Sequence, residues 1–183
     1  AARVVEHFRG VRAALATFVR AAEDLSAALP ITFTLTNQPD VPRVITWAFV
    51  AHANITAYTI TILGTDAKGN SVSVVLTEAD GWSGTTSIAF ATITSIIMSA
   101  RTGTGVADTM NVGIGSILGL SHGITSTASV YKVSKSTLAA GLATDYSGAA
   151  NVTPAVANDT IDVSVGGAIV SGDSFTVYYK ANQ

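Results

Sequence analysis

The chain contains no cysteine and few charged residues. Without cysteine it cannot form a disulfide, a thiolate zinc site or a cysteine nucleophile. Only 12% of its 183 residues are Asp, Glu, Lys or Arg, about half the share that is usual in globular proteins. The formal net charge is -2, so the basic excess typical of nucleic-acid-binding proteins is also missing. We therefore expect no nucleic-acid partner.

Long apolar runs are missing too. The longest nearly apolar stretch, Ile88 to Met98, is interrupted by Thr92, Thr94 and Ser95, whereas a membrane-spanning helix needs about 20 apolar residues. We therefore predict no transmembrane segment and no membrane partner. The sequence begins with Ala1 and has no stretch with the order of a signal peptide, so we expect either a removed initiator Met or a cleaved upstream segment.

Hydrophobic residues are abundant but thinly spread, since they make up 48% of the chain and are mostly Ala, Val and Ile, mixed with Thr. This composition excludes a disordered chain. A sparsely charged surface with exposed apolar patches tends to be covered by a partner, because a free monomer of this kind would aggregate. We therefore expect assembly into something larger.

The first 29 residues show apolar side chains at alternating spacings of four and three, which is the heptad pattern of a helix. The spacing predicts one long amphipathic α-helix that ends before Pro30, as an assembly or docking element over residues 1–29. The apolar stripe of this helix could bind a partner or sister subunit as a coiled coil, cover its own β domain, or lie on a membrane surface. We favour a homo-oligomer, a trimer, through Val4, Phe8, Val11, Leu15, Phe18, Ala22, Leu25 and Leu29.

After Pro30 the apolar period changes to two, as in strands. A Lys-Gly-Asn tip at residues 68–70 predicts a hairpin, and the run from Thr85 to Ala100 is long enough to bend or to form two strands. Residues 30–183 are therefore predicted to form a mainly β domain, a β-sandwich or jelly-roll-like barrel. The other expected strands are residues 31–36, 43–51, 55–63, 71–77, 109–113, 128–134, 160–165 and 174–180.

The sequence contains few residues that could form a catalytic site. The three histidines, His7, His52 and His122, are far apart in sequence and have no nearby ligand spacing. Six aspartates sit beside turn residues, where a carboxylate accepts hydrogen bonds from nearby backbone amides; they are Asp66, Asp80, Asp108, Asp145, Asp159 and Asp173. We predict no catalytic residue, metal ligand or cofactor site, and therefore no enzyme.

Several motifs carry a resemblance: Ile60–Asn70 (ITILGTDAKGN), Val75–Glu78 (VLTE), Ala89–Ile96 (AFATITSI), and Asp108–Gly115 (DTMNVGIG) followed by Leu118–Leu120 (LGL). Together they resemble a pattern common in structural proteins of tailed phages and related viruses. The resemblance covers about a third of the chain, and its matching residues are mostly turn glycines and strand residues. It implies a virion component of the head decoration or minor head type, with no catalytic residues to carry over.

The leading hypothesis is thus a virion structural protein, located in the extracellular particle, that binds the major capsid protein or other virion proteins. One alternative is a surface adhesion or carbohydrate-binding β-sandwich module, with Trp47, Trp82 or the pair Tyr178 and Tyr179 as a stacking platform. A cellular filament subunit would share the same assembly-prone composition.

Overall fold

The computed structural model describes residues 1–137 and 143–182, and this part of the chain is mainly β with no α-helix. It contains three short 3-10 helices, η1 (Glu78–Asp80), η2 (Thr127–Ser129) and η3 (Val156–Asn158). Its strands are β1 (Ala2–Val11), β2 (Leu15–Asp24), β3 (Ile31–Thr32), β4 (Arg43–Ala51), β5 (Ile55–Asp66), β6 (Ser71–Thr77), β7 (Ser83–Gly103), β8 (Thr109–Gly119), β9 (Val130–Ser136), β10 (Ala143–Asp145), β11 (Thr153–Ala155), β12 (Thr160–Asp162) and β13 (Asp173–Ala181).

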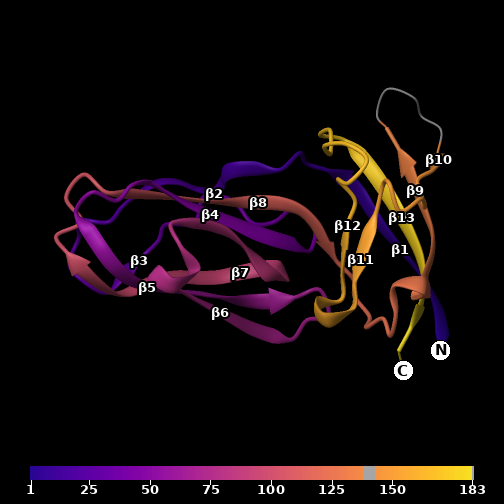
Figure 1. Cartoon of the computed structure of the whole chain (residues 1–183), viewed down its shortest axis with the longest axis horizontal. Coiled ribbons are helices and arrows are strands. Elements are labelled where there is room, and N and C mark those ends of the chain that lie inside the picture. Colours follow the sequence, from indigo (N-terminus) through magenta and orange to yellow (C-terminus); the bar gives the residue numbers. More distant parts are fainter. Residues whose placement is uncertain (138–142, 183) are drawn as a thin grey trace.

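Strands β2 to β8 form an elongated sandwich, which we call the long sandwich. One layer holds β2, β4 and β8, and the other holds β3, β5 and β6 (Figure 1). Strand β7 joins the two layers, because its first part pairs with β4 and the rest pairs with β5. The core between the layers is built from the inward side chains of these strands, among them Ile45, Ile60, Ile96 and Ile114.

The second body, the small sandwich, contains both ends of the described chain. Its main sheet has the order β1-β13-β9-β10, and the hairpin β11–β12 lies beside it (Figure 1). The core of this body is separate and contains Phe8, Val133, Phe175 and Ile161. Strand β8 connects the two bodies, since its first half contributes to the long-sandwich core and Leu118 contributes to the small-sandwich core.

The prediction of an N-terminal helix is wrong. The segment forms two strands, β1 and β2, and each joins a different body: β1 pairs with β13, and β2 pairs with β8. The register of β1 shifts between Phe8 and Val11, around Gly10 at φ 58°. A bulge of this kind inserts one extra residue and changes which face the following side chains occupy. Val4, Phe8 and Val11 therefore contact one core although their spacing is four and then three.

The β body is confirmed as sandwich-like. Strands β4 and β6 have the predicted bounds, and β5, β8, β9, β12 and β13 overlap their predicted ranges. The predicted hairpin joins β5 and β6, with Gly69 at φ 83° in its tip. The long run after Ser83 is one strand of 21 residues that changes partner near Phe90.

A buried arginine lies where the two bodies meet. The guanidinium of Arg43 is fully buried, and its Nε donates to the carbonyl of Gly115 in β8 at 2.7 Å. Its Nη1 donates to the carbonyl of Arg12, between β1 and β2, at 3.0 Å and to Oδ1 of Asp40 at 2.8 Å. The other carboxylate oxygen of Asp40 accepts the backbone N–H of Arg12 at 2.7 Å. One ion pair therefore joins the β1–β2 connection to β4 and β8.

We expect Arg43→Met to lower the free energy of unfolding by about 2–4 kcal/mol, because it leaves the buried carbonyl of Gly115 and the carboxylate of Asp40 without the donor that they share. Denaturant unfolding followed by circular dichroism measures the loss. Asp40→Asn and the double variant complete the cycle, and the double variant should lose less than the sum of the two single losses. Additive losses, or a loss below about 1 kcal/mol for Arg43→Met, would contradict the anchoring role.

Candidate functional site: the outer face of the four-stranded sheet

Four of the six aspartates expected in turns accept hydrogen bonds from nearby backbone N–H groups, as predicted. Oδ1 of Asp66 accepts the N–H groups of Lys68 and Asn70 at 2.8 and 2.9 Å, which closes the β5–β6 hairpin. Three others accept an N–H group two or three residues away, with acceptor and donor as follows: Asp80 and Thr77, Asp145 and Ser147, Asp173 and Val170. Asp108 and Asp159 instead accept the N–H groups of Asn54 and Ile124, which are distant in sequence. These carboxylates stabilise turns and connections.

The three histidines lie in three different places. His7 contacts the hydroxyl of Thr176 on the outer side of β1, with Nδ1 and Oγ1 3.1 Å apart. His52 stacks on Trp82 in the long sandwich, with ring centroids 4.2 Å apart. His122 follows β8, near the small sandwich. Within residues 1–137 and 143–182, no three His, Asp or Glu side chains are grouped closely enough to hold a metal ion.

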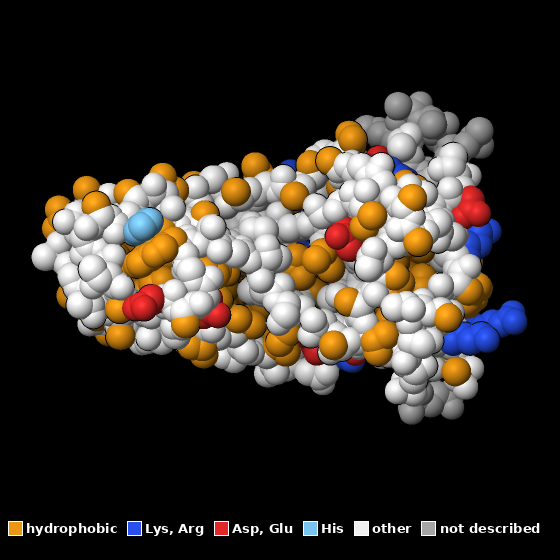
Figure 2. Space-filling view, in the orientation of Figure 1, with side chains coloured by type: hydrophobic (Ala, Val, Ile, Leu, Met, Phe, Trp, Pro, Cys, Tyr) orange, Lys and Arg blue, Asp and Glu red, His pale blue; other side chains and the backbone are white. Residues whose placement is uncertain are grey.

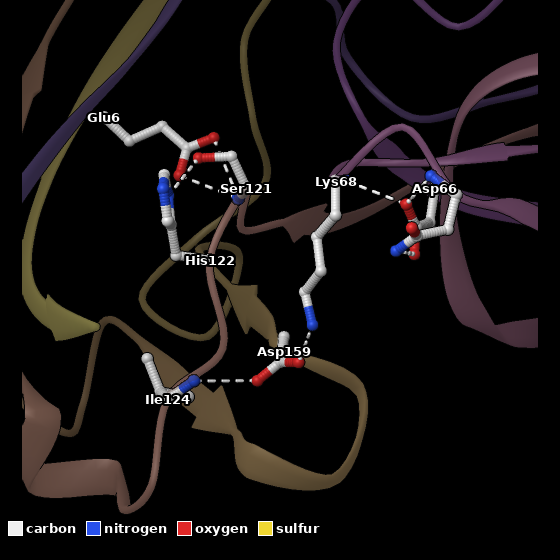
Figure 3. Close-up of polar contacts among 8 residues, drawn as sticks. Glu6, Asp66, Lys68, Ser121, His122, Ile124 and Asp159 are labelled. Atoms are coloured by element: carbon white, nitrogen blue, oxygen red, sulfur yellow. Dashed lines mark hydrogen bonds and ion pairs between the residues drawn. The ribbon is translucent and has the colours of Figure 1, made fainter. Parts of the chain in front are cut away.

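One cluster has the residue types of a hydrolase triad but a different connectivity (Figure 3). Nδ1 of His122 lies 3.0 Å from the hydroxyl of Ser121. The carboxylate of Glu6 accepts the backbone N–H of Ser121 at 3.1 and 3.2 Å and the hydroxyl of Tyr179 at 2.8 Å. A triad requires the acid to orient the imidazole, and Glu6 instead holds β1 against the end of β8.

The hydroxyl of Tyr179 belongs to the same group of hydrogen bonds around Glu6, which we call the Glu6 latch. Burial raises the pKa of Tyr179, and the negative charge of Glu6 raises it further, so the phenol keeps the proton that it donates. Glu6 is an acidic side chain on the inner side of β1, between Val4 and Phe8. Sequence reasoning did not identify this contact, because Ser121 and Tyr179 reach Glu6 only through the fold.

A second polar contact connects the two bodies (Figure 3). Lys68, in the tip of the β5–β6 hairpin, forms an ion pair with Asp159, whose Oδ1 accepts the N–H of Ile124 at 2.8 Å. The neighbouring cavity, between this hairpin and η3, measures about 40 Å³. Ligand pockets usually measure about 300–1,000 Å³, so this cavity is too small for a sugar or a nucleotide.

The aromatic residues considered as a stacking platform are mostly covered. Trp47 and Tyr179 are buried, and Trp82 is half-buried with one ring face against His52. Burial raises the pKa of Tyr58 to about 12, with smaller contributions from Asp80 and Glu78, and its hydroxyl donates to the carbonyl of Gly81. Trp47, Tyr58 and Trp82 pack against one another, whereas Tyr178 is half-buried on the outer side of β13, next to the exposed ring of Tyr131.

The residues expected to form one interface seam are divided among three environments. Phe8 and Val11 are buried in the small-sandwich core, and Val4 packs against it. Leu25 is buried in the long-sandwich core, and Phe18 packs against that core beneath the guanidinium of Arg12. The remaining three, Leu15, Ala22 and Leu29, are exposed. No single stripe joins these eight side chains, and the trimer expected from a helical seam loses its geometric basis.

The four-stranded sheet has a basic outer side. Side chains alternate along β1, so that Phe8 faces the core while Arg3, Val5, His7 and Arg9 face outward. The register brings outward side chains of β13 and β9 alongside them: Lys180 lies opposite Arg3, Tyr178 opposite Val5, and Lys132 opposite Tyr178. We call this surface the basic face and define it by six residues, Arg3, Val5, Arg9, Lys132, Tyr178 and Lys180.

The cations of the basic face differ from the other basic side chains. In the described part of the chain, Arg3, Arg9, Lys132 and Lys180 form no ion pair. Five of the other six form an ion pair or a side-chain hydrogen bond, namely Arg20 with Glu23, Arg43 with Asp40, Lys68 with Asp159, Arg101 with the carbonyls of Ser26 and Ala27, and Lys135 with Asp173. Arg12 and Lys132 each lie over an aromatic ring, that of Phe18 and that of Tyr178. Figure 2 shows blue side chains at the end of the molecule that carries the small sandwich.

One acidic residue stands at the edge of this surface. Asp145 in β10 lies opposite Ser134 of β9. Hydrogen bonds from the hydroxyl and backbone N–H of Ser147 hold the pKa of Asp145 below its ordinary value, and the charge of Lys132 lowers it slightly further. Asp145 is therefore engaged with Ser147, and the excess of positive charge remains on β1, β9 and β13.

No helix in the described residues is long and apolar enough to cross a membrane. Comparison with protein-family models, with curated proteins and with solved structures finds no match.

If Glu6 acts as a latch, Glu6→Gln should lower the free energy of unfolding by about 1.5–3 kcal/mol, since it replaces a charged acceptor that holds two donors. His122→Ala, at an exposed side chain, is the control and should change stability by less than about 0.5 kcal/mol. Thermal and denaturant unfolding measure both. Turnover of an activated ester by the wild-type protein that disappears in both Ser121→Ala and His122→Ala would instead show that the cluster is catalytic.

Proposed function

We propose that this chain is a non-enzymatic structural protein of a virion, a capsid decoration or minor head protein. In this proposal it binds the virion surface and neighbouring subunits and uses no cofactor. The observation that carries the proposal is a charge-poor surface with large apolar side chains left in water. Val50, Val75, Val106 and Val170 are each more than half exposed, and Leu15 is 49% exposed. Surfaces of this kind are typically covered in an assembly.

The resemblance to phage structural proteins supports the same proposal. The residues that carry it, from Ile60 to Leu120, run from within β5 to just past β8 and so build most of the long sandwich. Several of them have clear structural roles. Asp66 closes the β5–β6 hairpin, and a Cβ on Gly113 would lie 2.1 Å from the carbonyl oxygen of Leu15, so only glycine allows β2 to approach β8 this closely. The matching residues therefore shape the framework of the long sandwich, which is the role expected in a structural component of a virion.

The roles of the polar side chains support the same proposal. Carboxylates that could have served in catalysis close turns, join the two bodies or hold β1 to the end of β8. What remains available for recognition is the basic face and the exposed valines and leucines. A carbohydrate-binding module would need accessible aromatic ring faces, and of the proposed platform residues Trp47 and Tyr179 are buried, which leaves Tyr178 and the half-buried Trp82.

Virus particles purified from the source of this sequence provide the test. An antibody raised against the recombinant chain should label intact particles in electron microscopy, and mass spectrometry of the same particles should detect the chain at a fixed ratio to the major capsid protein. Glycan-array binding by the recombinant protein should stay at background. Absence from particles, together with labelling of a cell surface or a cellular filament, would contradict the virion assignment and favour an adhesion module or a filament subunit.

A further inference from the structure

The basic face places like charges directly opposite each other. Arg3 of β1 and Lys180 of β13 are register partners, and both are exposed. Like charges at directly opposite positions of an antiparallel pair destabilise a sheet. Among residues 1–137 and 143–182, no acidic side chain forms an ion pair with either of them. The fold therefore carries an electrostatic cost at this position that a bound anionic group would remove.

The centre of the basic face is apolar and aromatic. Val5 is 48% exposed and lies opposite Tyr178. The ring centroids of Tyr178 and Tyr131 are 6.4 Å apart. The ammonium of Lys132 lies over the Tyr178 ring, 5.3 Å from its centroid. An apolar centre with tyrosine, surrounded by arginine and lysine, matches the composition of protein–protein interfaces, where Tyr and Arg are enriched and the rim is polar.

We propose that the basic face docks onto an acidic surface of another protein. In this arrangement carboxylates of the partner lie between Arg3 and Lys180 and beside Lys132, while its apolar side chains cover Val5 and Tyr178. Charge complementarity is the argument for the partner's sign, because four cations that form no ion pair within the described residues gather on one face of a chain whose net charge is -2. The identification of the partner as a virion protein rests on the proposed function, whereas its acidic chemistry does not.

A protein partner fits this surface better than a nucleic acid. Binding to a phosphate backbone depends on many cations that follow the strand, usually in a protein with a basic excess. This chain has the opposite net charge, and its basic face has a half-exposed valine at the centre. A buried apolar centre contributes to protein docking and contributes little to phosphate recognition.

The test uses two acidic polypeptide probes, polyglutamate and a random copolymer of glutamate and tyrosine, with single-stranded oligothymidylate as the comparison. Biolayer interferometry on the full chain should show binding of both polypeptides at low salt that weakens as ionic strength rises. The copolymer should bind more tightly than polyglutamate, because its tyrosines can cover the apolar centre. The variant Tyr178→Ser should reduce that difference.

The decisive variant is the double substitution Arg3→Gln and Lys180→Gln, which should weaken binding of both polypeptides about tenfold. Its melting temperature should stay the same or rise, since the like-charge pair is gone. The control is Thr32→Glu with Ser73→Glu, at exposed positions of β3 and β6 on the long sandwich, because it changes the net charge by the same amount. Its binding should stay within about twofold of wild type. Should the double variant misfold, Lys132→Gln on β9 replaces it, and Ser73→Glu alone is then the control with the same change of net charge.

Three results would overturn the inference: no polypeptide binding at low salt, equal weakening by the double variant and the control, or oligothymidylate binding more tightly than either polypeptide. The last result would identify a nucleic-acid surface instead. No virus particle enters this assay. Failure of particle labelling with intact polypeptide binding would therefore remove the virion role alone, and the reverse outcome would remove the docking face alone.

Discussion

The buried guanidinium of Arg43 is the contact on which the arrangement of the two bodies depends. A buried cation is unfavourable unless hydrogen bonds and an opposite charge replace its hydration. Here the replacements come from three parts of the chain, namely Asp40, the carbonyl between β1 and β2, and the carbonyl of Gly115 in β8. The chain passes from the small sandwich to the long sandwich at Arg12, so the hydrogen bond from Nη1 of Arg43 to the Arg12 carbonyl also fixes that crossing.

The N-terminal segment makes the two bodies interdependent. Strand β1 completes the four-stranded sheet beside β13, and β2 covers β8 in the long sandwich. Between them the chain is held by Arg43 and by Asp40, which accepts the N–H of Arg12. The Glu6 latch and the ion pair of Lys68 with Asp159 add two further connections across the same junction. A segment expected to stand apart as a docking helix is thus part of both sheets.

The strands of the β body could be predicted because their signals are local. Alternating side chains and a Lys-Gly-Asn turn mark β4, β6 and the β5–β6 hairpin within a few residues. The N-terminal segment misled the prediction because register shifts in both strands, at Gly10 in β1 and on either side of Arg20 in β2, interrupt the two-residue period expected of strands. An inward acid, Glu6, also interrupts the apolar alternation of β1, and its donors Ser121 and Tyr179 are more than a hundred residues away. The basic face needs the pairing of β1, β13 and β9, which no local pattern contains.

Scarcity of charge makes the position of each cation informative. Five of the ten basic residues in the chain form an ion pair or a side-chain hydrogen bond, and four of the other five lie on the outer side of one sheet. The long sandwich extends away from the four-stranded sheet (Figure 1). A partner on the basic face would therefore leave the long sandwich projecting outward, with the exposed Val50 and Val106 free to contact neighbouring subunits. Electrostatics would then orient the chain on its partner, and apolar contacts along the long sandwich would join it to its neighbours.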